Sequence, residues 1–206
     1  MASKLVVFSF GRLNPPTIGH EKLANAVKIA AQKLGGEPRM YLSHTQDKKK
    51  NPLPYELKLK YAQAAFGPLV TASDANTIIK ILAELNKQFT DMVFIAGSDR
   101  VAEFEKLFND YNGKGEYDFR TIRVISAGER DPDSDGVEGM SASKMREAAA
   151  ANDIKSFTGG LPAKLKPAAA TIIKAVRMGM GLNEAVEPHP AGYQKDILAS
   201  PNTPWS

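Results

Sequence analysis

The 206-residue chain contains no cysteine. Disulfide bonds, thiolate metal sites and cysteine nucleophiles are therefore excluded, and any chemistry must use other side chains. A long hydrophobic run is also missing. The first apolar stretch, Leu5 to Phe10, is too short to cross a membrane and is not followed by a small-residue cleavage site. We therefore expect a cytoplasmic protein with no membrane partner.

A strong charge of one sign is absent as well. The formal net charge is +4, and lysine and arginine are spread along the chain apart from one cluster, Lys48 to Lys50. This balance does not indicate a specific nucleic-acid partner. The lysine cluster fits a solvated loop and a loop that attracts phosphate equally well. With 43% hydrophobic and 24% charged residues, the composition is that of an ordinary globular domain, with or without an appendage.

Short apolar runs alternate with longer segments that have helical spacing, and each run is of a length typical of a buried strand. Strands that alternate with helices in this way imply right-handed crossovers. We therefore expect an α/β fold, a Rossmann-like, doubly wound parallel sheet of five strands with helices on both faces. The strand runs that we identify are 5–10, 40–42, 92–96 and 121–125, and the helical segments are 19–34, 54–66, 76–89 and 99–111.

The last third of the chain has a different pattern. Residues 141–151 and 162–178 predict two helices, and after Gly179 the sequence becomes rich in proline and scattered polar residues. The tail is either a loose appendage or an arm that docks on the body or on another subunit of a homo-oligomer. We expect three parts, a Rossmann-like domain over 1–151, a C-terminal helical extension over 152–180 and an irregular tail over 181–206.

One loop leaves the first strand and enters the first helix, where a doubly wound sheet builds its phosphate site. Gly11 permits close approach of a ligand to the backbone, and Thr17 to His20 fall at the helix N-terminus, whose free N–H groups favour anions. His20 can donate a hydrogen bond to a phosphate oxygen as charge grows in phosphoryl transfer. The alternative is a proline-rich turn with a capping threonine and a surface histidine.

A second segment, Gly139 to Arg146, opens a helix after an acid-rich stretch. Ser141 and Ser143 offer hydroxyls in the first turn, and Arg146 lies three residues after Ser143, so it can reach the same helix end. Together they predict an anion cradle. The alternative is a plain serine N-cap with a solvent-exposed arginine.

Two further polar segments follow strands. Gly97 and Asp99 come after the run 92–96 and should face the carboxyl edge of the sheet, unless Asp99 is only a helix N-cap. His44 comes after 40–42 and is either a contact to a substrate or a polar strand end.

These segments resemble the signatures of the nucleotidyltransferase superfamily. The run Gly-x-x-Asn-Pro-x-Thr-x-Gly-His is similar to the family's Thr-x-Gly-His loop after the first strand. Ser141 and Arg146 match its second signature, Ile-Ser-Ser-Thr-x-x-Arg, with Met140, Ala142 and Ser143 as variants. With Gly-Ser-Asp-Arg between them, the pattern resembles small nucleotidyltransferases encoded by tailed bacteriophages, over about residues 4–151.

The resemblance assigns roles to individual residues. It implies that Thr17 binds phosphate, that His20 is the donor to the triphosphate in the transition state, and that Arg146 acts with them. The nucleotide-binding residues that it implies are Phe10, Gly11, Gly19, Gly97, Asp99, Ser141 and Ser143, and those on the acceptor side or its loop are Arg12, His44, Lys48 and Lys49. Arg12 and Leu13 depart from the small or aromatic residues common there, so the acceptor pocket is expected to differ from those of well-described relatives.

The reaction that the resemblance implies is in-line attack by an acceptor phosphate on the α-phosphorus of a nucleoside triphosphate, with release of pyrophosphate. ATP is the expected donor, and nicotinamide mononucleotide the leading acceptor, because residues 43–54 are similar to a loop of archaeal-type nicotinamide mononucleotide adenylyltransferases. Residues 138–143 also resemble glycerol-phosphate-type cytidylyltransferases, and a non-catalytic nucleotide-binding or virion-associated protein is a further alternative. Mg²⁺ would bridge the phosphates, held mostly by substrate and water because no carboxylate cage is visible.

Overall fold

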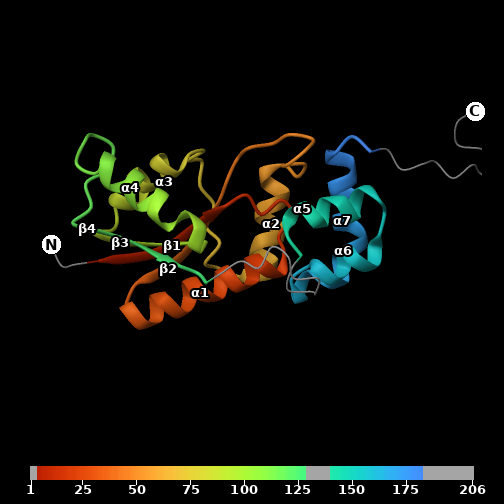
Figure 1. Ribbon diagram of the computed structural model, residues 1–206, viewed down its shortest axis with the longest axis horizontal. Coiled ribbons are helices and arrows are strands. Elements are labelled where there is room, and N and C mark those ends of the chain that lie inside the picture. Colours follow the sequence, from red (N-terminus) through yellow and green to blue (C-terminus); the bar gives the residue numbers. More distant parts are fainter. Residues whose placement is uncertain (1–3, 129–139, 183–206) are drawn as a thin grey trace, which may run out of the picture.

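The core of the molecule is a parallel sheet, seen in a computed structural model that describes residues 4–128 and 140–182 (Figure 1). All three strand pairs are parallel, and the strand order is β2-β1-β3-β4. The doubly wound α/β class predicted from the sequence is therefore confirmed. The four strands are β1 (Leu5–Gly11), β2 (Glu37–Leu42), β3 (Asp91–Ala96) and β4 (Thr121–Ser126).

The prediction of five strands was wrong for the described residues, in which the sheet has four. Beside the outer edge of β2 the chain forms a single parallel bridge, between Met40 and Val70. The N–H of Met40 donates to the carbonyl of Leu69 at 2.8 Å. Before this bridge, Gly67 has a positive φ of 82° and is followed by a proline, which has no N–H to donate. After the bridge, Ser73 begins a turn, in which its side chain accepts from the N–H of Ala75. The extended stretch between them is too short to form a strand.

Strand β2 is longer than the run 40–42 predicted from its apolar residues, because it begins at Glu37. Its first residues, Glu37, Pro38 and Arg39, are polar or lack an N–H, which hides them from a search for apolar runs. An outer strand tolerates a proline, since the missing N–H does not break a pair of central strands. Arg39 donates to Glu37 and to Gln88, which ties the polar start of the strand to the body.

Helices cover both faces of the sheet, as predicted. Helix α1 (Ile18–Leu34) lies on one face, and α3 (Ile78–Asn86) and α4 (Val101–Tyr111) lie on the other (Figure 1). Alternate strand residues point to the two sides. Val7 belongs to the apolar cluster that includes residues of α1, whereas Phe8 belongs to the one that includes residues of α3 and α4.

A group of helices lies beside the end of the sheet at which β1 finishes (Figure 1). Their apolar side chains join the same core cluster as α1. One of these helices, capped by Asp153, was not predicted because two glycines occupy its last turn. The predicted helix over 162–178 is a 3₁₀ segment followed by an α-helix, with Pro167 inside the former. These elements are α2 (Tyr55–Phe66), α5 (Ala142–Ala150), α6 (Ile154–Gly160), η3 (Ala163–Ala168) and α7 (Ala169–Gly179), and a short 3₁₀ helix η1 (Ser98–Arg100) precedes α4.

Along the described parts of the chain, no helix combines the length and the apolar character needed to cross a membrane. Residues 183–206, most of the predicted tail, and 129–139, the acid-rich stretch before α5, lie outside the described residues.

Gly179 at the end of α7 makes a close backbone contact with Pro52. A Cβ atom on Gly179 would overlap the carbonyl oxygen of Pro52, and backbone yields less easily than a flexible side chain. We expect Gly179→Ala to lower the free energy of unfolding by about 1–3 kcal/mol, measured by urea denaturation. The matched control is Gly159→Ala in α6, where nothing lies within 4 Å of the added atom, so this variant should be neutral or slightly stabilising. Equal stability of the two variants would contradict the expected packing.

Candidate functional site

The loop between β1 and α1 is held in place by the side chain of Asn14. Its amide is buried and pairs with the backbone of Leu53, because Nδ2 donates to the Leu53 carbonyl at 3.0 Å and Oδ1 accepts from the Leu53 N–H at 2.8 Å. The neighbouring Leu13 has a φ of 46°, in the left-handed region that a leucine rarely adopts, and its side chain is fully buried. The loop therefore has one fixed shape, specified by packing and by this amide pair.

Asn14→Ala should destabilise the protein. It removes both hydrogen bonds and leaves a buried N–H and a buried carbonyl of Leu53 without these partners, which costs about 2–4 kcal/mol in free energy of unfolding. Urea denaturation measures the loss. Asn109→Ala is the matched control, because that exposed asparagine donates only to the Glu105 carbonyl of its own helix and should cost little. A similar small loss for both would show that the Leu53 pairing contributes little.

Thr17 and His20 form the start of α1. Thr17 is the N-cap, and its Oγ1 accepts from the N–H of Gly19 at 3.2 Å. The N–H of Thr17 donates to Nδ1 of His20 at 3.0 Å, which completes a capping box with histidine in the place usually taken by glutamate or glutamine. Since a backbone N–H can only donate, Nδ1 is the acceptor, and the neutral imidazole carries its proton on Nε2. His20 is 8% exposed, and the hydrogen bond from Thr17 leaves Nε2 as the donor atom of the ring.

Arg146 links the second predicted segment to this loop. Ser141 is the N-cap of α5 and accepts from the N–H of Lys144 at 3.2 Å, as the serine-cap interpretation predicts. Arg146, half-buried, donates through Nη1 to the carbonyl of Asn14 at 3.0 Å, across a separation of 132 residues. It is therefore not a plain solvent arginine. The hydrogen bond brings the second turn of α5 to the loop between β1 and α1, at the carboxyl end of β1.

Lys58 is a member of the site that sequence reasoning missed. Its side chain is 0% exposed, and Nζ donates to the carbonyl of Arg12 at 2.8 Å and to the carbonyl of Ser43 at 2.6 Å. Burial, and then the neighbouring charge of Arg12, lower the pKa of Lys58 to about 8. The sequence pattern that could have revealed it is helical spacing, because Lys58 lies on the same buried stripe of α2 as Tyr61 and Ala62.

The charges around the loop are predominantly positive. Burial, and then the charge of Arg12, lower the pKa of Arg146, as they do for Lys58. None of the three forms an ion pair with a carboxylate among the described residues. The ion pairs there join other cations to acids, namely Arg39 to Glu37, Arg100 to Glu103, Lys106 to Asp110 and Arg120 to Asp91. Such a cluster attracts anions.

Two nearby carboxylates, Asp47 and Glu147, oppose this lowering of the Arg146 pKa. Asp47 lies in the loop after β2. Its oxygens already accept from the N–H groups of Lys49 at 2.9 Å and Lys50 at 2.7 Å and from Nδ2 of Asn51 at 2.7 Å. These hydrogen bonds lower the pKa of Asp47 to about 2. The lysine cluster is therefore carried on a tight turn closed by Asp47, with Lys48 and Lys49 exposed.

His44 lies at the end of β2, where its ring stacks on Tyr55 with centroids 3.7 Å apart. Its Nε2 is 2.7 Å from the carbonyl of Ser73 and donates to it, and the N–H of Ser73 donates to the Tyr55 hydroxyl at 3.1 Å. These contacts fix the ring against the body of the protein.

The remaining predicted residues lie at the same edge of the sheet but are not all in one cluster. Gly97 follows β3, and the Asp99 side chain folds back over it, since a Cβ on Gly97 would lie 2.9 Å from the Asp99 carboxylate. Asp99 lies within η1 and does not cap α4. Lys48 is close to Gly181, beyond α7. Phe10 and Gly11 end β1, Gly19 is exposed in the first turn of α1, and Ser143 is exposed in the first turn of α5.

A metal centre made of protein ligands was not found in the described parts of the chain. No group of three or more histidine, aspartate or glutamate side chains there could hold an ion.

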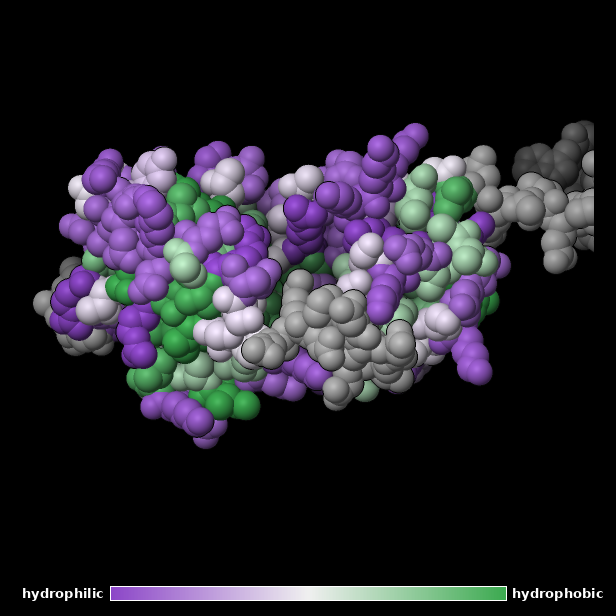
Figure 2. All heavy atoms as spheres, in the orientation of Figure 1, coloured by the Kyte–Doolittle hydropathy of each residue, from purple (hydrophilic) through white to green (hydrophobic). Residues whose placement is uncertain are grey.

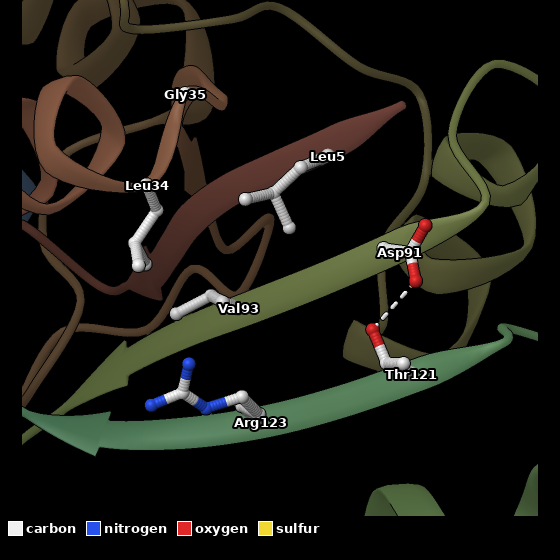
Figure 3. Close-up of a pocket in the computed structure, with 7 residues that line it drawn as sticks. All are labelled: Leu5, Leu34, Gly35, Asp91, Val93, Thr121 and Arg123. Carbon is white, nitrogen blue, oxygen red and sulfur yellow. Dashed lines mark hydrogen bonds between the residues drawn. The ribbon is translucent and has the colours of Figure 1, made fainter. Parts of the chain in front are cut away.

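A cavity of about 390 Å³ lies away from this site (Figure 3). Leu5, Asp91 and Thr121 are the first residues of their strands, so the cavity is at the amino edge of the sheet. In the space-filling view, hydrophobic atoms reach the surface among hydrophilic ones over the half of the molecule that holds the sheet (Figure 2). None of the predicted site residues lines the cavity, which is therefore not the candidate site.

Two comparisons found nothing similar: no protein-family model and no curated protein matches the sequence. Among solved structures, the chain is similar to Plasmodium falciparum nicotinic acid mononucleotide adenylyltransferase complexed with NaAD, with a TM-score of 0.54 and 16% sequence identity. The match covers 87% of this chain and 98% of that chain. At this identity the likeness shows the fold alone, which is the Rossmann-like α/β fold of an adenylyltransferase.

Proposed function

We propose that this chain is a nucleotidyltransferase that moves a nucleoside monophosphate from a nucleoside triphosphate to a phosphorylated acceptor and releases pyrophosphate. The observation that carries the proposal is the 3.0 Å hydrogen bond from Arg146 to the Asn14 carbonyl. It ties α5 to the loop between β1 and α1 at the carboxyl edge of a parallel sheet, where such sheets bind ligands. The likeness in fold to an adenylyltransferase supports the same activity.

The proposed roles follow from the donors that each residue offers. The positive end of the α1 dipole attracts phosphate, and Nε2 of His20 donates to a non-bridging oxygen of the α-phosphate as charge grows there. Arg146 and Arg12 supply positive charge to the triphosphate. In the reaction, an ionised oxygen of the acceptor phosphate attacks the α-phosphorus, and the bond from that phosphorus to the bridging oxygen breaks. Because the attacking oxygen carries no proton, the protein needs no general base.

Magnesium would neutralise charge on the triphosphate when bound. The described residues include no cluster of carboxylates for it, so the ion would be held by the phosphates and by water.

ATP is the proposed donor and nicotinamide mononucleotide the proposed acceptor. The acceptor follows from the similarity of residues 43–54 to the corresponding loop of nicotinamide mononucleotide adenylyltransferases. The solved adenylyltransferase of similar fold is named for a related acceptor, nicotinic acid mononucleotide, which supports a pyridine mononucleotide as the acceptor class.

Pyrophosphate release from a matrix of triphosphates and acceptors tests this function. ATP and CTP are each combined with nicotinamide mononucleotide, nicotinic acid mononucleotide and glycerol 3-phosphate, with magnesium present. Release that needs both substrates and is lost in His20→Ala supports the proposal. Binding of ATP without release from any pair would identify a non-catalytic nucleotide-binding protein instead.

A further inference from the structure

Lys58 joins the ends of two neighbouring strands from beneath the site. Arg12 comes directly after β1 and Ser43 directly after β2, and the Lys58 Nζ donates to the carbonyls of both. A third acceptor, Oγ of Ser43, is 3.3 Å away. The N–H of Ser43 also donates to the Gly11 carbonyl at 2.9 Å, so the two strand ends form one unit.

The number of acceptors makes the protonation of Lys58 important. An ammonium has three N–H donors and can serve three oxygens, whereas a neutral amine has only two. The surroundings oppose the charge, because burial and the charge of Arg12 both lower the pKa of Lys58, to about 8. Arg12 also acts on Arg146, and the carboxylates that act on Arg146 are Asp47 and Glu147. His44, which follows β2, and Tyr55, which begins α2, are further titratable side chains, and they stack on each other.

We propose that Lys58 is a positioning residue of the phosphate site: as an ammonium it holds the ends of β1 and β2 at a set spacing, and an anion bound among Arg12 and Arg146 keeps it in that charged form. This inference rests on the proposed function for the identity of the anion, a triphosphate. Lys58 itself does not contact the ligand, because its donors are used by the protein backbone and Ser43.

Binding should therefore be linked to proton uptake. Above pH 8 the free protein increasingly loses the Lys58 proton, and the bound protein retains it because the anion stabilises the ammonium. The complex then carries more protons than the free protein, so affinity falls as pH rises. The effect is largest between the lowered pKa of about 8 and the ordinary lysine value of 10.5.

Calorimetry with ATP at pH 7.5 and pH 9.0 tests this linkage, each in two buffers with different heats of ionisation. The wild type should lose about five- to tenfold in affinity between the two pH values and take up protons on binding at pH 9.0. Lys58→Arg keeps a cation that stays protonated over this pH range and should remove most of this dependence. Lys58→Met should bind weakly at both pH values. Lys60→Met, at an exposed position of the same helix, is the matched control and should behave as the wild type.

The same fall in affinity for the wild type and Lys58→Arg, or no proton uptake by the wild type, would overturn the inference. Should Lys58→Arg fail to fold, proton uptake by the wild type decides alone. The result is separable from the proposed function. ATP binding that takes up protons, without pyrophosphate release, would refute the proposed function and support the role of Lys58. Nucleotide transfer with an ATP affinity that does not depend on pH would support the proposed function and refute the role of Lys58.

Discussion

Replacing His20 with alanine should lower the rate of transfer at least about a hundredfold, while affinity for the triphosphate stays within a few-fold of the wild type. The reason is that the hydrogen bond from Nε2 strengthens as charge develops on the α-phosphate, so it contributes to the transition state more than to the bound substrate. Single-turnover rates measure the first quantity and calorimetry the second. Equal losses in rate and binding would make His20 a ligand of the ground state.

His20→Gln separates catalysis from helix capping. Glutamine is a usual partner in a capping box, so its side chain can accept from the Thr17 N–H as Nδ1 does now. This variant should melt near the wild-type temperature and yet transfer slowly, because it lacks the imidazole donor. His20→Ala loses the cap as well, at about 1 kcal/mol. Wild-type turnover in His20→Gln would leave His20 with a structural role only.

Arg146→Lys is expected to weaken triphosphate binding by about ten- to a hundredfold. Lysine keeps the charge but cannot donate to the Asn14 carbonyl and to a phosphate with the planar fork of a guanidinium. Calorimetry with ATP measures the loss. Because this arginine also fastens α5 to the loop, part of the effect will come from looser positioning of the loop.

Arg177→Lys is the matched control for this variant. Arg177 donates through Nη1 to the carbonyls of Ala149 at 2.7 Å and Ala150 at 3.0 Å, at the opposite end of α5. Both variants lose guanidinium contacts to backbone carbonyls, so both should lower stability by a similar small amount. Only the change at Arg146 should affect ATP. Unchanged affinity there would show that Arg146 holds the fold and does not bind the nucleotide.

Periodicity predicted most of the fold, and its failures have physical causes. The apolar runs of β1 and β3 and the stripe of α1 were visible because burial on a strand or helix imposes a regular spacing. The start of β2 was hidden, since a polar outer strand carries no such pattern. The prediction of a fifth strand named no residues for it, and in the described residues the sheet has four strands, with a single bridge between Met40 and Val70 beside β2.

The candidate site was predictable where a motif carries it and unpredictable where tertiary contacts do. Thr17 and His20 are three residues apart, which is the spacing of a capping box, but the usual residue at the N3 position is glutamate or glutamine and not histidine. The meeting of Arg146 with the Asn14 carbonyl could be expected only from resemblance, because it depends on the packing of α5. Lys58 was missed because lysine is usually a surface residue, although its position in the buried stripe of α2 marks it as buried.

The bond between Arg146 and Asn14 also bears on the order in which the molecule assembles. It closes a loop of 132 residues, and the strand pairs beneath it are all parallel, so each needs a long crossover before it forms. During synthesis, the loop after β1 leaves the ribosome long before its partner on α5 exists. The loop between β1 and α1 must then wait, with the Asn14 carbonyl open to water, until α5 has emerged. The site is in this sense among the last parts of the protein to be completed, even though its first residues are among the earliest to be made.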